Sequence, residues 1–90
     1  MTNELMVVKN VRAYIDENNV AQINAEDAAR GLGFTREQNG IQYVRWDRVN
    51  QYIQEFGIYP QVGKDDFIPE GMFWRLAMKA NADGRQLTNI

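Results

Sequence analysis

Residues 24–34 read Asn-Ala-Glu-Asp-Ala-Ala-Arg-Gly-Leu-Gly-Phe, and this stretch predicts one short helix with a signal at each end. Asn24 is a favourable N-cap residue, and Asp27 three positions later can reach back to it in the manner of a capping box. Gly33 supplies the left-handed residue that commonly ends a helix, and Phe34 can fold back onto the last turn. A helix followed by Gly-Phe-Thr is compatible with the opening of a helix-turn-helix and equally with a capped surface helix.

The composition describes a chain with one core and little catalytic chemistry. Its 90 residues are 44% hydrophobic and 11% aromatic, which is enough for one domain. The sequence contains no Cys, His or Ser, which excludes disulfides, thiolate or imidazole metal ligands and the usual nucleophilic dyads. We therefore expect no enzymatic activity, no metal and no cofactor. A carboxylate pair for glycoside hydrolysis stays open, and Asp65-Asp66 is more simply a solvated turn than a magnesium pair.

Charge is distributed unevenly along the chain. The net charge of −2 argues against binding to nucleic acid or membranes that is driven mainly by electrostatics. Residues 1–29 carry two bases and five acids (−3), residues 30–48 four bases and two acids (+2), and residues 49–90 four bases and five acids (−1). If DNA is bound, the middle segment is the place to look. No apolar run approaches the ~20 residues of a membrane span and no signal-peptide pattern is present, so we expect a cytoplasmic protein with no membrane contact.

The N-terminal part predicts a β-hairpin that leads directly into the first helix. The stretch from Leu5 to Ile15 is rich in β-branched and aromatic residues, and the run from Val20 to Ile23 returns as a second strand. Residues 16–19 (Asp-Glu-Asn-Asn) form the turn between them, because Asn and Asp tolerate left-handed backbone conformations.

The segment after the first helix has chemistry suited to DNA. Thr35 and Gln38 form a second capping box, but the helix that it would start meets Asn39-Gly40 too early for an ordinary recognition helix. Arginine and amide side chains here suit phosphates and base edges, and they are equally ordinary loop residues. The candidate DNA-binding residues are Arg36, Gln38, Asn39, Arg45 and Arg48.

Hydrophobic spacing predicts two further helices. The first has apolar residues at helical intervals and a stop at Gly57, after a brief extended segment over 40–45; its apolar residues are Trp46, Val49, Ile53 and Phe56. A loop over 58–66 follows, and Pro69 then opens the next helix at its first position.

The last helix has more apolar surface than one core face uses. Its core face spans an arc of ~140° and comprises Met72, Phe73, Leu76, Ala77 and Ala80. Trp74 and Met78, four residues apart, lie on a different arc, and we interpret them as a candidate protein-interaction surface. The alternative is that the N-terminal strand covers them through Met6 or Val8.

Three segments share one order and spacing that is more specific than any of them alone. They are NAEDAARGLGF (24–34), YVRWDRVNQYIQEFG (43–57) and DFIPEGMFWRLAMKANA (66–82). Together they resemble the Bro-N domain, the N-terminal module of phage antirepressors and BRO-family proteins, over roughly residues 7–82. The resemblance implies a non-catalytic phage or prophage regulator that binds DNA or captures a repressor protein. The chain departs from the family at residues 83–86 (Asp-Gly-Arg-Gln), where a further helix usually follows.

These observations predict a single α+β domain. An N-terminal β-hairpin with short added strands packs against about three helices, over 25–32, 46–56 and 70–81. The Bro-N-like antirepressor module spans 1–82, and 83–90 form a frayed tail. The expected function is transcription-regulatory binding of DNA, a repressor protein or both, with a possible homodimer. The alternative is a pure protein-interaction or dimerisation domain without nucleic-acid contact.

Overall fold

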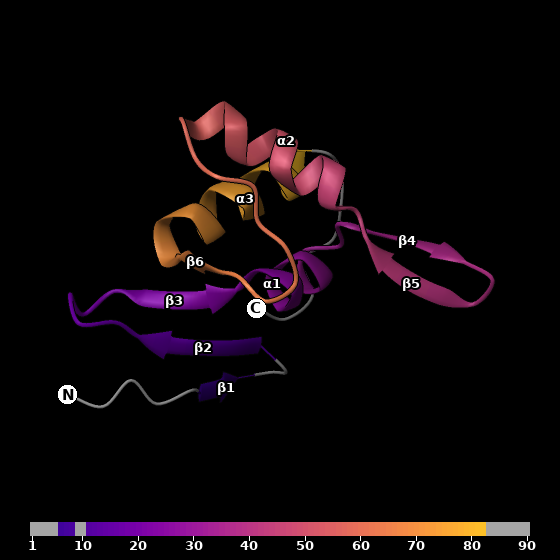
Figure 1. The fold of residues 1–90 in the computed structure, drawn as a ribbon. Coiled ribbons are helices and arrows are strands. Elements are labelled where there is room, and N and C mark those ends of the chain that lie inside the picture. The colour runs from indigo at the N-terminus through magenta and orange to yellow at the C-terminus, as the bar shows by residue number, and fades with distance from the viewer. Residues whose placement is uncertain (1–5, 9–10, 83–90) are drawn as a thin grey trace.

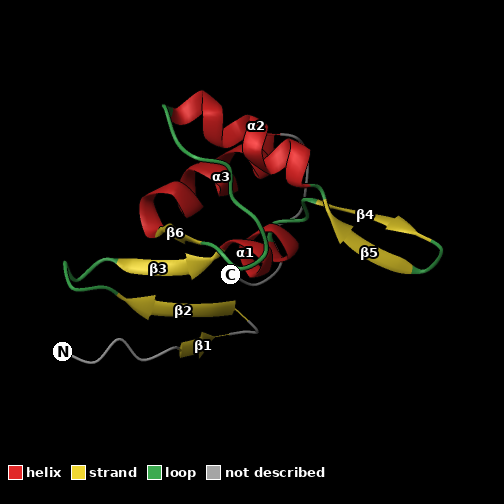
Figure 2. Ribbon diagram, in the orientation of Figure 1, coloured by secondary structure: helices red, strands yellow, loops and turns green. Residues whose placement is uncertain are grey.

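The computed structural model of the chain describes residues 6–8 and 11–82 and has the predicted α+β class (Figure 1). These described residues form three helices and two small antiparallel sheets (Figure 2). The strands are β1 (Met6–Val8), β2 (Val11–Ile15), β3 (Ala21–Asn24), β4 (Thr35–Gln38), β5 (Ile41–Val44) and β6 (Phe67–Pro69). The helices are α1 (Ala25–Gly31), α2 (Trp46–Phe56) and α3 (Glu70–Ala82). The tail predicted over 83–90 lies outside the described residues.

The larger sheet has the strand order β1-β2-β3-β6. The predicted hairpin is present as β2 and β3, and its turn places Asn19 at a φ of 65°. The carboxylate of Asp16 accepts hydrogen bonds from the backbone N–H groups of Asn18 and Val20, which fixes the turn. The stretch before the turn holds two strands rather than one, because β1 folds back to pair with β2.

Strand β6, which was not predicted from the sequence, pairs with β3 and leads directly into α3. Ile68 of β6 lies opposite Ile23 of β3, and Ile68 is buried. Pro69 is therefore the last residue of a strand and not the first of a helix, and α3 begins at Glu70. An edge strand tolerates proline, because the missing N–H would face away from the sheet.

Residues 35–44 form a β-hairpin, so the predicted capping box and truncated recognition helix are wrong. Asn39 and Gly40 have φ angles of 55° and 79°, the pair of positive values that a two-residue hairpin turn of type I′ requires. Both positions favour Asn and Gly for this reason. The hairpin β4–β5 projects from the body of the protein beyond α1 and α2 (Figure 1).

Helix α1 has the predicted ends but not the predicted capping box. The Asn24 side chain accepts a hydrogen bond from the backbone N–H of Asp27 at 3.0 Å. At the other end Gly33 has a φ of 83°, and the N–H groups of Gly33 and Phe34 donate to the carbonyls of Arg30 and Ala29 in a Schellman arrangement. The Asp27 carboxylate does not reach back to the cap, because it binds Arg12 of β2 instead.

The core lies where the three helices meet β3 and β6. Leu32, Phe34 and Ile53 are fully buried there, and the five residues of the predicted core face of α3 are all buried. Helix α2 has the predicted bounds, but Trp46 and Phe56 at its two ends are only partly buried and pack against the rim of the core. Tyr52 lies between these ends and is buried, and its ring meets that of Phe34 edge-on at 5.7 Å.

Candidate functional site

Residues 30–48, the segment with a net charge of +2, fold into one continuous part of the structure. They comprise the end of α1, the hairpin β4–β5 and the start of α2. Arg30 donates from Nη1 to the carbonyl of Gln42 in β5 at 3.3 Å, and the N–H of Arg45 donates to the carbonyl of Phe34 at 2.8 Å. The hairpin is therefore held at its base by the Arg45–Phe34 bond and along β5 by Arg30 from the last turn of α1. Arg30 was absent from the predicted site, although it lies in the same basic segment.

One face of the hairpin carries two of the predicted DNA-binding side chains. Arg36 lies opposite Tyr43 and Gln38 lies opposite Ile41, so these four side chains share a face. Ile41 is 55% exposed and Tyr43 44% exposed, so this face looks outward. The other face bears Val44, which packs against the core and orients the hairpin. Within the described part of the chain, the Arg36 guanidinium has no hydrogen-bond or ion-pair partner.

The two predicted arginines of α2 and its N-cap have more restricted surroundings. Arg45 lies 3.8 Å from the carboxylate of Asp47 and is about one-third exposed. Arg48 donates from Nη1 to the hydroxyl of Tyr52 at 3.3 Å, and its guanidinium carbon is 5.9 Å from the centre of that ring. Arg48 therefore helps to pack α2, whereas Arg36, Gln38 and Asn39 on the hairpin are exposed. In the structure, the hairpin residues and Arg45 lie in one region. Arg48 has a different role, because its guanidinium packs against Tyr52 of its own helix.

Two buried asparagines, which were not predicted to lie in the core, anchor the loop over 57–66. Asn24 donates from Nδ2 to the carbonyl of Lys64 at 3.0 Å. Asn50 donates to the carbonyl of Val62 at 3.1 Å, and its Oδ1 accepts from the N–H of Val62 at 2.8 Å. The burial of Asn50 could have been predicted from the sequence, because Asn50 lies next to Val49 on the apolar face of α2. A polar residue on such a face is buried only when its hydrogen bonds are satisfied.

Arg12 and Asp27 form a structural ion pair that joins β2 to α1. Arg12 donates from both its backbone N–H and its Nε to Oδ2 of Asp27, each at 2.8 Å. Burial acts to raise the pKa of Asp27, but the hydrogen bonds and charge of Arg12 outweigh it and hold the pKa below its ordinary value. The same pair raises the pKa of Arg12. Because every partner is internal, this carboxylate stabilises the fold and offers no general base.

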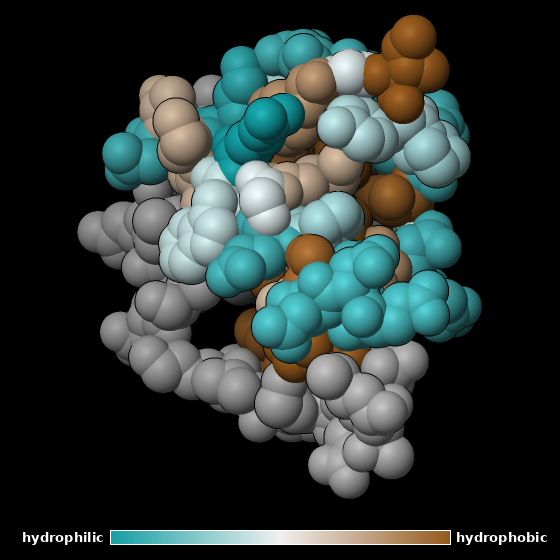
Figure 3. Space-filling view, turned by 90° about the vertical axis from the view of Figure 1, so that its left-hand side faces the viewer, coloured by the Kyte–Doolittle hydropathy of each residue, from teal (hydrophilic) through white to brown (hydrophobic). Residues whose placement is uncertain are grey.

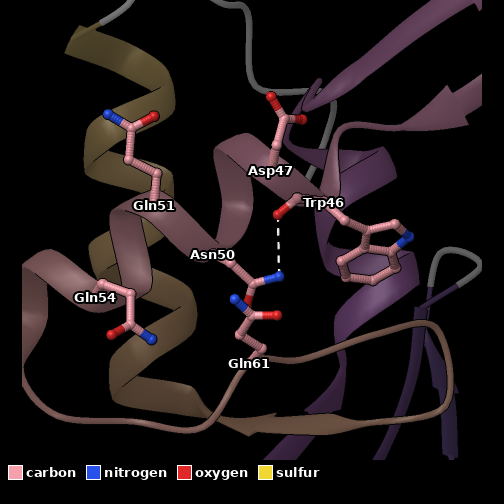
Figure 4. A pocket seen from close by; sticks show the side chains of 6 residues that line it. All are labelled: Trp46, Asp47, Asn50, Gln51, Gln54 and Gln61. Atoms are coloured by element: carbon pink, nitrogen blue, oxygen red, sulfur yellow. Dashed lines mark hydrogen bonds between the residues drawn. The ribbon is translucent and has the colours of Figure 1, made fainter.

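A polar hollow of about 350 Å³ lies between α2 and the following loop (Figure 4). Its side chains do not converge on one point, and the amide of Asn50 is already bound to the carbonyl of Trp46 at 3.0 Å. Gln54 also donates its amide to the carbonyl of Tyr59 at 2.8 Å. These amides hold the loop in place, which leaves the hollow few groups to bind a ligand.

No metal centre is formed by the residues that the structure describes. Within residues 6–8 and 11–82, no three acidic side chains are close enough together to hold an ion. The Asp66 carboxylate accepts from the N–H of Gly63 at 2.7 Å, and the N–H of Asp66 donates to the carbonyl of Gly63 at 3.1 Å. Asp65-Asp66 thus forms the end of a turn.

Trp74 and Met78 are exposed on α3 but have different neighbours. Trp74 is 50% exposed and meets the ring of Phe73 edge-on at 5.0 Å. Met78 is 71% exposed and lines a hollow that also includes Phe56 and Arg75. The alternative, that Met6 or Val8 covers them, depends on the side chains of β1, which the structure does not describe.

Comparison with known proteins identifies no relative of this chain. No family model, curated protein or solved structure matches the chain. The resemblance to the Bro-N domain therefore stays a prediction. In the described part of the chain, no helix combines the length and the apolar character that crossing a bilayer needs.

Proposed function

We propose that this chain is a non-catalytic regulatory module of the phage-antirepressor type, and that it contacts DNA through the hairpin β4–β5. The observation that carries the proposal is the projecting two-stranded ribbon, whose outward face bears Arg36 and Gln38, two side chains that have no hydrogen-bond or ion-pair partner among the residues that the structure describes. We further propose the cytoplasm as its compartment, because its DNA target would be there.

The shape and chemistry of the hairpin support a contact in a groove. The major groove of B-DNA admits a two-stranded β-ribbon, and arginine and glutamine are common readers of guanine and adenine edges. Ile41 and Tyr43 on the same face offer apolar surface to a thymine methyl group or to sugars. Asn39 lies at the exposed tip, where it can reach furthest from the body of the protein.

The charge of the chain sets the expected strength of binding. Arg30 and Arg45 flank the base of the hairpin, but each has a carboxylate nearby, and the net charge of the whole chain is −2. Few phosphates are therefore neutralised, so the dependence of binding on salt concentration should be shallow.

The test is binding to a labelled mixed-sequence duplex at several salt concentrations. Arg36→Gln should weaken binding and, because one phosphate contact is lost, lower the slope of log K against log salt by about one unit. Lys64→Gln is the matched control, because it removes the same charge from an exposed loop position away from the hairpin. An unchanged slope in the Arg36 variant, or an equal loss in the Lys64 variant, would refute the hairpin site.

The second candidate function is a protein-interaction or dimerisation domain that captures a repressor or a second copy. The exposure of Trp74 and Met78 on one helix favours it, because aromatic and methionine side chains are frequent anchors at protein interfaces. Absence of salt-dependent DNA binding together with a complex in sedimentation would favour this candidate over the first.

A further inference from the structure

A long depression lies between the end of α2 and the exposed side of α3. Its larger part, about 520 Å³, is lined by Glu55, Phe56, Arg75, Met78, Lys79 and Ala82. A second part of about 210 Å³ shares Phe56 and Arg75 with the first and extends to Pro69, Gly71 and Met72 at the start of α3. We call the two parts together the α2–α3 groove.

The apolar surface of the groove is concentrated on both sides of Phe56. Met78 lines the larger part and is mostly exposed, and Tyr59 lines the smaller part. Ile58, directly after the helix stop at Gly57, is fully exposed. Figure 3 shows the face on which α2 ends, where a strongly hydrophobic group stands out at the top among polar neighbours. The apolar surface that lines the groove itself is that of Phe56, Tyr59, Met72 and Met78, and exposed apolar surface in a hollow is typical of a contact site.

The charges of the groove are not balanced. Lys79 forms an ion pair with Glu55 at 2.8 Å, so these two charges largely cancel. Arg75 lies over the ring of Phe56, with its guanidinium carbon 5.8 Å from the ring centre. Within the described part of the chain, Arg75 has no carboxylate within 4 Å. A guanidinium that is positioned by an aromatic ring and lacks an anion is well suited to bind a carboxylate with two parallel hydrogen bonds.

We propose that the α2–α3 groove binds a short segment of a partner protein in which an acidic residue lies beside an apolar one. The apolar side chain packs on Phe56 and Met78, and the carboxylate binds Arg75. Methionine adapts its shape to different apolar groups, which suits a surface that receives a flexible segment. Trp74, which does not line the groove, extends the contact along α3. The proposal deepens the protein-binding candidate function and does not depend on the DNA contact.

The experiment uses isotope-labelled chain and three designed helical peptides observed by NMR titration. The first peptide combines Leu with Glu, the second replaces each Glu by Lys, and the third replaces each Leu by Ser. We expect the first alone to shift the signals of the groove residues, because it alone supplies both an apolar side chain and a carboxylate. Equal shifts with the lysine peptide would show that Arg75 does not select an anion and would overturn the proposal.

Substitutions in the groove test whether Arg75 and Met78 make the contact. Arg75→Gln should weaken binding of the Leu/Glu peptide about tenfold, the loss expected for one charge-assisted contact, and Met78→Ser should weaken it comparably. Lys64→Gln is the control, because it removes a positive charge from an exposed loop position that does not line the groove, and it should leave peptide binding unchanged. Thermal unfolding of each variant is measured as well, to test that each variant retains the fold.

Two results with these variants would overturn the proposal. One is unaltered peptide binding by both groove variants. The other is a concentration-dependent dimer in sedimentation that Met78→Ser abolishes, because the groove would then hold a second copy. If the unmodified chain binds the peptide but shows no salt-dependent DNA binding, that result would count against the hairpin site alone, so the two proposals fail separately.

Discussion

Substitution of Asn24 should reveal how strongly one buried amide holds three parts of the fold together. Its Oδ1 accepts from the N–H of Asp27 at 3.0 Å and from Nη2 of Arg12 at 3.0 Å. Its Nδ2 donates to the carbonyls of Lys64 at 3.0 Å and Asp66 at 3.4 Å. The side chain is only 1% exposed, so water does not replace these bonds when they are removed.

The expected loss in the free energy of unfolding follows from the hydrogen bonds that each substitution removes. Asn24→Ala loses the N-cap, which contributes about 1 kcal/mol, and removes the side-chain donor of the Lys64 carbonyl, at about 1–3 kcal/mol. The carbonyl of Asp66 keeps the backbone N–H of Ala25 as a donor at 2.8 Å. The free energy of unfolding should therefore fall by about 2–4 kcal/mol, a large part of the 5–15 kcal/mol typical of a domain. The expected drop in Tm is roughly 10 °C or more. Asn24→Ser keeps a capping oxygen and loses only the donors, so it should cost about half as much.

Urea unfolding followed by circular dichroism measures these differences. Asn18→Ala is the control, because Asn18 lies exposed in the β2–β3 turn and only its backbone N–H makes a described hydrogen bond. A loss below about 1 kcal/mol for Asn24→Ala, which is less than the cap alone contributes, would refute the reasoning. Equal losses for the serine and alanine variants would show that the cap itself contributes nothing.

Two further predictions concern the backbone and pH. Gly57→Ala should destabilise the protein by about 1–3 kcal/mol, because φ at Gly57 is 155° and the new Cβ would lie 3.0 Å from the ring of Tyr59. Gly71→Ala is the control, because a Cβ at Gly71 would meet open space. An equal fall in Tm for both variants would contradict this reason. The lowered pKa of Asp27 means that its stabilising effect is present above an ordinary carboxyl pKa of about 3.9 and is lost as pH falls through the folded value. The difference in unfolding free energy between wild type and Asp27→Asn should therefore be constant near neutral pH and shrink below about pH 4; a difference that does not change with pH would contradict it.

Local signals in the sequence were sufficient wherever an element's ends and faces are set by its own residues. The spacing of apolar residues predicted α2 with its observed bounds and the complete buried face of α3. The turn after Ile15 was predicted because Asn and Asp tolerate left-handed backbone conformations, and Asn19 adopts one with a φ of 65°. The same reasoning was wrong for residues 35–38, where a capping pattern competes with the hairpin turn that Asn39-Gly40 prefers.

The candidate binding surfaces were predicted only in part. The basic segment over 30–48 and the exposed pair Trp74 and Met78 were visible in the sequence, because charge and helical arc can be counted there. Arg36 has no partner among the described residues, whereas Arg48 packs against Tyr52, and this difference depends on which element lies beside each side chain. The α2–α3 groove was not visible at all, because its walls come from segments separated by the whole loop over 57–66.

The sequence by itself determined the class of the fold, the three helices, the first hairpin and the lack of Cys, His and Ser chemistry. Each of these depends on residue type or on contacts between near neighbours in the chain. Only the tertiary structure decided that β6 joins β3, that Asn24 and Asn50 fasten the distant loop, and that Arg75 faces Phe56 without an anion among the described residues. Those features depend on pairings between distant residues, and their energies are set by burial and geometry that no local pattern records.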